Sequence, residues 1–303
     1  MQTSSPNMNT LEVQCNNGKS VVTRQYATYP VRFVKLNNDF DDCCHIYTLS
    51  YGGGLVSGDK CNMNITVGES ANLCIRTQGS TKVYKNSEGK VTQQTIQATV
   101  RENSLLALLP DPVVGYADSR YLQSQSFDLH KDGSLVVVDW FTCGRGALRN
   151  EFWQQNSIST DLRIIRDGKA VLIDNLLLQN SSSGSISLKV GHSDVFGTMI
   201  IMGQKTRGIA EILLSMSKRE TFREKRVGMK RKSDFLTSGT TDDIHDPSHA
   251  PLISCSKLAQ EDDAYLFRFI AFSTESAYKL LAEVLRPLCA VTGTFPYIDR
   301  LVV

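Results

Sequence analysis

Hydrophobic and polar residues alternate in short segments between about residues 47 and 190. The segment "CNMNITV" places Met63, Ile65 and Val67 on one face and polar residues on the other, and "TIQATV" repeats the alternation. A period of two is typical of a half-buried β-strand. "SLVVVDWF" and "KAVLIDNLLL" are continuous apolar runs, and the Asp-Gly pairs in "KDGS" and "RDGK" predict hairpins beside them. We therefore expect a mostly β fold that is mainly antiparallel.

The C-terminal third changes to a helical period. In "QKTRGIAEILLSMSKRE" the apolar residues recur at three and four, and the same spacing returns between Ala277 and Leu288, with Ser273 or Thr274 available as the N-cap. Two α-helices beside the β body follow from this pattern. Residues 228–251 are rich in Ser, Thr, Asp and Pro, which predicts a mobile insertion. At 303 residues the chain could form one large β domain or two smaller ones.

Composition narrows the function classes only a little. Hydrophobic residues make up 41% and charged residues 21% of 303 residues, with a net charge of +2, as in an ordinary globular protein. This balance gives no case for nucleic acid or a membrane surface as partner. The polar start "MQTSSPNMNT" lacks the apolar core of a secretion signal, and the eight cysteines form no C-x-x-C pair. We expect a cytoplasmic protein with reduced thiols.

The stretch "YGGGLVSGDK" invites comparison with a phosphate-binding loop. Gly53 and Gly58 have the P-loop separation, but Asp59 stands where that motif has its lysine. A carboxylate among backbone amides would repel a phosphate. The glycines, Gly52 and Gly54 included, are therefore expected to let the backbone turn tightly, so that Asp59 projects from a fixed position.

No tight metal site is predicted. "DDIHDPSH" offers His245 and His249 beside three aspartates, as a weak surface site for a divalent ion or as a solvated acidic loop. In "DCCHIY", Cys43 and His45 can share a face, but two ligands leave a site incomplete.

The segment "KRETFREKRVGMKRK" is a basic run that suits a protein-docking surface as well as nucleic acid.

Catalytic motifs are also scarce. The chain has no G-x-S-x-G and no H-E-x-x-H. Cys143 lies two residues before Arg145, which could favour its thiolate, yet no histidine is near in sequence. We expect no enzyme activity.

What remains is a set of polar residues within apolar β segments: Asp59, Thr77, Ser80, Lys82, Asp111, Asp139, Arg145, Glu151 and Asp174. Asp139 interrupts "VVVDWF" and Asp174 interrupts "VLIDNLLL". A buried carboxylate is costly unless it is paired, binds an ion or faces internal water. A buried ion pair with Arg145 or Lys82 is one explanation.

Four segments together resemble the urease accessory protein family UreD, called UreH in some organisms. They are "YTLSYGGGLVSGD" (47–59), "RTQGSTKVYK" (76–85), "LLALLPDPVVGYADSRYLQ" (105–123) and "VDWFTCGRGALRNEFW" (138–153), in the family's order and approximate spacing. The resemblance extends from about residue 29 to the C-terminal helix, so residues 29–303 are expected to be a single UreD-like domain. Residues 1–28 are then expected to be an N-terminal segment that is partly flexible.

This resemblance implies a large, elongated and winding β structure with two helices. It also implies a non-enzymatic scaffold for urease maturation. Its implied partners are a UreF-like accessory protein, a UreG-like GTPase recruited through UreF, and apo-urease. The implied cargo is transient Ni(II), with no tightly bound cofactor, moving through an internal water-filled passage. Residues that suit such a passage are Asp59, Ser80, Asp139, Glu151 and Asp174, because scattered oxygen ligands attract a dication without trapping it. Motif residues expected to shape it are Gly52, Gly53, Gly54, Gly58, Lys82, Pro110, Gly144 and Arg145.

Two alternatives stay open. The protein could be a structural adaptor between urease and the GTPase, with nickel travelling elsewhere. It could also be a metal-dependent hydrolase that uses Asp59, Asp139 and Asp174.

Overall fold

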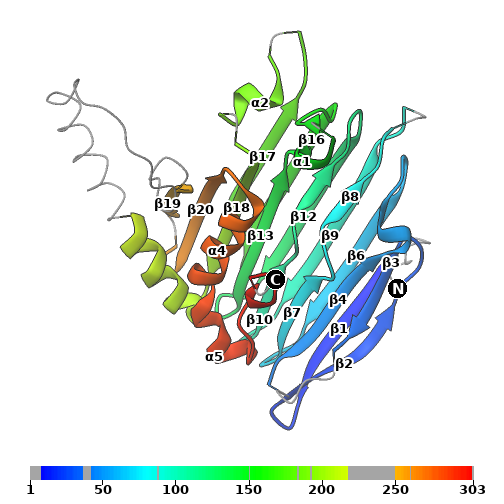
Figure 1. The fold of residues 1–303 in the computed structure, drawn as a ribbon. Coiled ribbons are helices and arrows are strands. Elements are labelled where there is room, and N and C mark those ends of the chain that lie inside the picture. The colour runs from blue at the N-terminus through cyan, green and yellow to red at the C-terminus, as the bar shows by residue number, and fades with distance from the viewer. Residues whose placement is uncertain are drawn as a thin grey trace, which may run out of the picture.

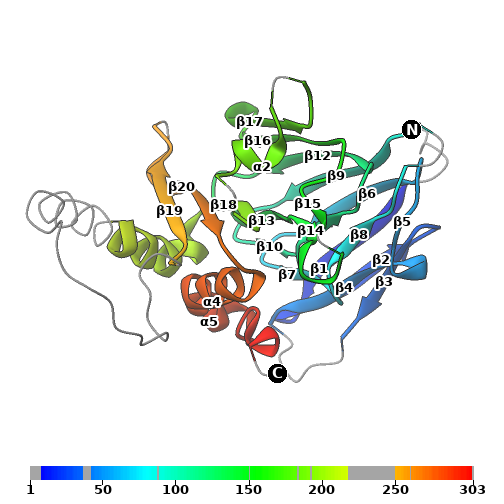
Figure 2. The same ribbon diagram turned by 45° about the horizontal axis from the view of Figure 1, so that its top comes forward.

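A computed structural model describes residues 8–36, 42–86, 89–149, 151–182, 184–191, 193–217, 250–259 and 261–301. Two large β-sheets face each other, and long strands run side by side through both (Figure 1). Helices lie on the outer side of one sheet, so the molecule has three layers (Figure 2).

The first sheet has seven strands. In spatial order they are β17 (Lys169–Gln179), β16 (Ser157–Arg166), β12 (Arg120–Leu129), β9 (Thr92–Val100), β6 (Lys60–Val67), β1 (Asn9–Asn16) and β2 (Lys19–Tyr26). The alternation read from the sequence is visible along β6, where Cys61, Met63, Ile65 and Val67 are buried and the residues between them are not.

The second sheet has eleven strands. Its main path is β19 (Leu252–Lys257), β20 (Ala264–Ala271), β18 (Val195–Met202), β13 (Ser134–Thr142), β10 (Leu105–Leu109), β7 (Asn72–Thr77), β4 (Cys44–Ser50) and β3 (Val31–Lys35). Three short strands extend it beside β13: β11 (Val113–Gly115), β8 (Thr81–Val83) and β5 (Gly54–Leu55). A separate hairpin joins β14 (Gly144–Arg145) to β15 (Glu151–Phe152).

The expectation of a mainly antiparallel fold is wrong. From β6 to β13 the chain alternates between the sheets, so that β6, β9 and β12 are parallel neighbours in one, and β7, β10 and β13 in the other. Parallel neighbours need a crossover connection, and here a strand of the opposite sheet provides it. Antiparallel pairs occur toward the ends of the sheets, at β1–β2, β16–β17, β3–β4, β13–β18, β18–β20 and β19–β20.

The two Asp-Gly pairs have different outcomes. Asp167 and Gly168 have φ of 48° and 75° and join β16 to β17, so this hairpin prediction is confirmed. Asp132 and Gly133 do not close a hairpin, because they pass the chain from β12 in the first sheet to β13 in the second. Gly133 N–H donates to the carbonyl of His130 at 2.9 Å in this turn.

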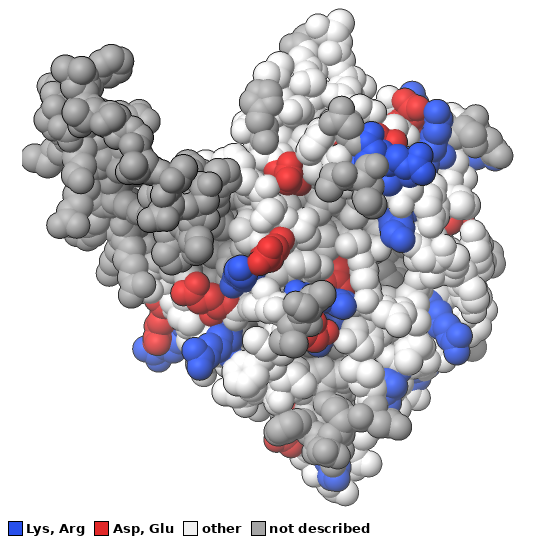
Figure 3. Space-filling view, in the orientation of Figure 1, with Lys and Arg blue, Asp and Glu red and all other residues white. Residues whose placement is uncertain are grey.

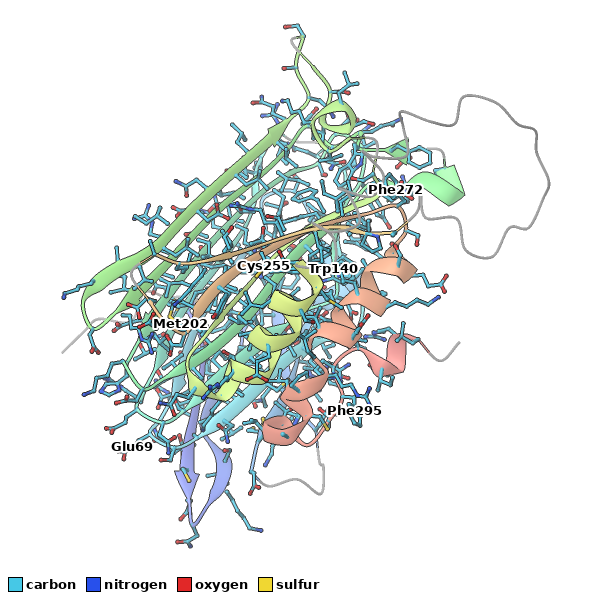
Figure 4. All side chains as sticks on the ribbon, turned by 90° about the vertical axis from the view of Figure 1, so that its left-hand side faces the viewer. Glu69, Trp140, Met202, Cys255, Phe272 and Phe295 are labelled. Atoms are coloured by element: carbon cyan, nitrogen blue, oxygen red, sulfur yellow. The ribbon has the colours of Figure 1, made fainter. Side chains whose placement is uncertain are left out.

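The second sheet is buried on both faces, which explains the continuous apolar run of β13. Leu135, Val137 and Phe141 belong to the core between the sheets, whereas Val136, Val138 and Trp140 belong to the core beneath the helices. The Trp140 ring meets the ring of Tyr278 edge-on at 4.9 Å between centroids, and Figure 4 shows Trp140 beneath the helical layer.

Both helices expected in the C-terminal third are present. The first covers residues 207–217, and the second is α4 (Thr274–Val284), capped by the Ser273 hydroxyl, which accepts from the Ser276 N–H at 3.1 Å. The count of two is wrong, since the four-residue helix α5 (Cys289–Thr292) also forms in the C-terminal third. Two more four-residue helices, α1 (Gly146–Arg149) and α2 (Ile186–Lys189), form earlier in the chain. Short 3-10 turns are η1 (Tyr51–Gly53), η2 (Gln204–Thr206), η4 (Arg286–Leu288) and η5 (Ile298–Arg300).

The N-terminal strands belong to the first sheet. Leu11 and Val13 of β1 are fully buried in the core between the sheets, so residues 9–26 share that core. The expected insertion lies outside the described residues, apart from Ala250 and Pro251. No helix within the described ranges is long and apolar enough to cross a bilayer.

Candidate functional site

Asp139 lies at the centre of the candidate site, between the two sheets. On β13 it has the same phase as Leu135, Val137 and Phe141, and side chains two residues apart share one face of a strand. Its carboxylate therefore points into the core between the sheets. No ion pair with Asp139 forms within the described part of the chain, so the predicted partners Arg145 and Lys82 are both wrong for it.

Three hollows follow one another around Asp139. A surface cleft of ≈ 400 Å³ lies between β4 and the segment 77–82. An inner cavity of ≈ 70 Å³ between the sheets shares Thr48, Ser50, Thr77 and Thr81 with that cleft. An outer cavity of ≈ 160 Å³ lies on the other side of Asp139, which borders both cavities. Since a buried water needs roughly 10–15 Å³ by this measure, the inner cavity has room for several waters.

Polar side chains line this series of hollows at one level of each sheet. In the first sheet Gln94, Gln123 and Thr160 stand opposite one another on β9, β12 and β16. In the second sheet Asp139, Thr198 and Arg268 stand opposite one another on β13, β18 and β20. All six line the inner or the outer cavity. We call these six residues the polar level of the sandwich, because they lie side by side across the core between the sheets.

Burial raises the pKa of the Asp139 carboxyl to about 7, a hydrogen bond with the Gln123 side chain lowers it, and the nearby charge of Asp174 raises it. Gln123 is itself fixed, because its Oε1 accepts from the Tyr121 hydroxyl at 2.8 Å. That hydroxyl also lies 3.1 Å from Oε1 of Gln94. The partial exposure of Asp139 is surface that faces the two cavities. Among the described residues, the carboxylate therefore has neutral polar neighbours and the charge of Asp174 nearby, but no ion-pair partner of its own.

Asp174 closes the far side of the outer cavity. It lies on β17, and its Oδ1 accepts from Nη2 of Arg268 on β20 at 2.6 Å. The sequence suggested a buried ion pair for Asp174 with Arg145 or Lys82, and the partner is instead Arg268, 94 residues away in the chain. This ion pair joins the first sheet to the second at the edge of the sandwich.

Asp111 borders the inner cavity on the opposite side and is fully neutralised. Arg300 donates to it through Nε at 3.0 Å and Nη2 at 2.7 Å, and the Tyr278 hydroxyl donates at 2.7 Å. The Thr77 hydroxyl adds a contact at 3.2 Å. Asp111 and Asp174 thus each bind an arginine, whereas Asp139, which lies between them, binds none within the described residues.

Sequence reasoning missed the inward glutamines. Gln123 and Gln125 are 2% and 4% exposed and alternate with outward residues on β12. Oε1 of Gln125 has no hydrogen-bond partner within the described residues. Their spacing could have shown that they face inward, because they lie at even separations from the buried Tyr121 and Phe127 on the same strand.

The glycine stretch forms a tight turn, as predicted. Gly52 and Gly53 have φ of 70° and 72°, and a Cβ on Gly54 would lie 2.7 Å from the Lys82 carbonyl oxygen. Asp59 is 9% exposed, and its Oδ2 accepts from the Val56 N–H at 2.9 Å and the Tyr29 hydroxyl at 3.3 Å. Asp59 is not among the residues that line the three hollows, so its place on a nickel path stays a prediction.

Glu151 and Arg145 form a pair across the β14–β15 hairpin. Arg145 donates through Nε at 2.9 Å and Nη2 at 2.8 Å, and its guanidinium lies 4.1 Å from the centre of the Tyr116 ring. This contact outside the three hollows fixes the hairpin. The role of Glu151 on a path also stays a prediction.

The remaining predicted residues fall into three groups. Ser80 and Lys82 line the surface cleft, and Pro110 lines the inner cavity. Gly58 and Gly144 have positive φ at chain turns. His245 and His249 lie outside the described residues.

Among the described residues, the candidate site included, no group of three His, Cys, Asp or Glu could hold a metal ion. His45, weighed beside Cys43, is buried, and its Nε2 lies 2.7 Å from the Thr292 carbonyl oxygen. Burial lowers the pKa of this imidazole. On the face shown in Figure 3, acidic and basic side chains are interspersed.

Comparison with known proteins gives a consistent result. The model of the family described as UreD urease accessory protein matches residues 8–301. Urease accessory protein D of Oryza sativa subsp. indica is 33% identical over 284 residues, which are 92% of each chain. The protein of the same name from Arabidopsis thaliana is 31% identical over 284 residues, 92% of this chain and 96% of its own. An uncharacterized urease accessory protein ureD-like from Schizosaccharomyces pombe is 34% identical over 235 residues, 74% of this chain and 79% of its own. The chain belongs to the UreD urease accessory protein family.

Proposed function

We propose that this protein acts in urease maturation, as a scaffold that carries Ni²⁺ to apo-urease along the polar level between its sheets. Its relatives carry the name urease accessory protein, which supports the general role. The path through the molecule, its direction and its end points are parts of the proposal.

The observation that carries the proposal is the carboxylate of Asp139, which borders two adjoining cavities and has no cation partner within the described residues. A carboxylate buried among apolar strands is unfavourable unless something compensates it. A passing dication supplies that compensation transiently, and the surrounding glutamines and threonines provide neutral oxygen atoms.

The lining suits transport better than storage. A set of thiolates and imidazoles would hold Ni²⁺ tightly, whereas carboxylate, amide and hydroxyl oxygens together with water hold it loosely. Cys61 is the cysteine that lines the inner cavity, and burial raises the pKa of its thiol to about 12, which keeps it protonated and a poor ligand. An ion that meets oxygen ligands one at a time can leave each of them again.

The proposed scaffold also connects proteins. It bridges apo-urease to a UreF-like protein, and through it to a UreG-like GTPase, as the family resemblance implies. The surface cleft and the edge of the sandwich at Asp174 are the two ends at which partners would meet the path.

The hydrolase alternative is not favoured, because its three carboxylates are separated. Asp139 and Asp174 line the outer cavity together, whereas Asp59 binds the Val56 N–H in the glycine turn. The other alternative, a structural adaptor without a nickel path, is tested by the following experiment.

The experiment is co-expression with urease and the other accessory proteins at limiting nickel. Asp139→Asn removes the central charge and keeps the side-chain shape, so urease activation should fall at least tenfold while the chain still copurifies with its partners. Asp128→Asn, an exposed change on β12, is the control. Normal activation by Asp139→Asn with intact complexes would show an adaptor instead. Loss of copurification in the unchanged chain would reject the scaffold.

A second variant tests the predicted role of Asp59. Asp59→Ala should lower activation and leave the partner complex intact. Wild-type activation by this variant would remove Asp59 from the path and leave it as the carboxylate that holds the glycine turn.

A further inference from the structure

The ion pair between Arg268 and Asp174 joins the two sheets at the edge of the sandwich, beside the outer cavity. Asp174 lies on β17, the last strand of the first sheet, and Arg268 on β20 of the second. Their closest atoms are 2.6 Å apart, and both residues line the outer cavity. The Arg268 side chain is 54% exposed and that of Asp174 25% exposed, so the pair lies at the boundary between the cavity and the solvent.

Arg268 also ends the polar row that begins at Asp139. In this row Asp139 pairs with Thr198, and Thr198 pairs with Arg268, across three adjacent strands. Residues directly opposite in a sheet point to the same face. The charged lining of the outer cavity therefore comprises two carboxylates and, among the described residues, one cation.

We propose that Arg268 is the gate of the outer cavity, and that its guanidinium must leave Asp174 before a divalent cation can pass between the cavity and the surface. The inference rests on the proposed nickel path and adds a control point to it. The guanidinium occupies the carboxylate that an arriving dication would need, and its positive charge repels that ion. A partly exposed ion pair is held weakly, so it opens without unfolding its surroundings.

A merely structural cross-link between the sheets would have different consequences. It would fix the sandwich edge and leave cation binding unaffected. Removing the charge of Arg268 distinguishes the gate from the structural cross-link, because a gate without this charge stays open to cations. Arg268→Lys keeps the charge and should behave like the wild type. Arg163→Gln is the matched control, since Arg163 and Asp161 form an ion pair on β16 that lines none of the three hollows.

The test is a titration of the full chain with NiCl₂, followed by methyl resonances. Leu162 and Leu176 line the outer cavity, and bound Ni²⁺, which is paramagnetic, broadens nearby methyl signals. In Arg268→Gln the half-broadening concentration should be at least tenfold lower than in the wild type. Arg268→Lys and Arg163→Gln should match the wild type, and Arg268→Gln combined with Asp174→Asn should lose the gain.

Equal half-broadening concentrations in the wild type and Arg268→Gln would overturn the gate. The same result for Arg163→Gln as for Arg268→Gln would also overturn it, because the effect would then be general to surface charge. Absence of broadening at both leucines in every variant would reject the gate as well. The proposed function is judged separately by urease activation with Asp139→Asn.

Discussion

The charge of Asp139 should make the protein less stable at neutral pH, and Asp139→Asn tests this directly. Burial raises the pKa of the folded-state carboxyl from 3.8 to about 7. A shift of about three pKa units, at 1.36 kcal/mol each, corresponds to about 4 kcal/mol of differential stability. Asparagine has nearly the same shape and cannot ionise, so it lacks this contribution.

The sign follows from proton binding. Between pH 3.8 and about 7 the folded state keeps the Asp139 proton, whereas the unfolded state has lost it. Stability therefore falls as pH rises through this window and levels off above it. Near pH 3.5 the unfolding free energies of the variant and the wild type should depend on pH in the same way. By pH 8 the variant should have gained about 4 kcal/mol relative to the wild type.

The assay is urea unfolding at half-unit steps from pH 3.5 to pH 8.5, read by tryptophan fluorescence. The quantity compared is the difference in unfolding free energy between Asp139→Asn and the wild type, so that other titrating groups cancel. Asp128→Asn on the exposed side of β12 controls for the loss of any carboxylate. A difference that stays constant over the whole range would refute the burial of an ionised Asp139 in this environment.

Two further changes probe the frame around the cavities. Arg300→Gln should lower the free energy of unfolding, measured in urea, by about 2–4 kcal/mol, because Asp111, only 2% exposed, loses its charged partner. An unchanged urea midpoint would show that another group neutralises Asp111. Gly197→Ala should lower the stability by about 1–3 kcal/mol, because the added methyl group would collide with the Phe269 ring, whereas Gly79→Ala, which meets no atom within 4 Å, should have little effect in the same thermal-melting experiment.

The strands were predictable because their local patterns are strong, but their partners were not. The run "SLVVVDWF", rich in valine and aromatic residues, predicted a strand, and β13 is one. The order of strands depends on which turns return the chain to the same sheet. "RDGK" and "KDGS" look alike, yet only Asp167 and Gly168 adopt the positive φ of a hairpin turn. A mainly antiparallel fold was the natural but wrong conclusion.

The candidate site was partly predictable for a similar reason. Asp139 was conspicuous, because a carboxylate in an apolar run is costly wherever the strand is buried. Gln94 and Gln123 were not conspicuous, because glutamine is ordinary on a strand until the inward face is known. The pairing of Arg268 with Asp174 joins two sheets across 94 residues of chain, and no local pattern encodes such a contact.

The central claim is that nickel crosses the polar level between the sheets, and blocking that level tests it most directly. Thr198 lines the outer cavity beside Asp139, and an indole at this position would fill a hollow of ≈ 160 Å³. Thr99→Trp on β9, which lines none of the three hollows, is the control. Nickel per urease active site, measured by mass spectrometry after co-expression, should fall at least tenfold with Thr198→Trp while the partner complex still copurifies. A wild-type nickel content with Thr198→Trp in that intact complex would contradict the account.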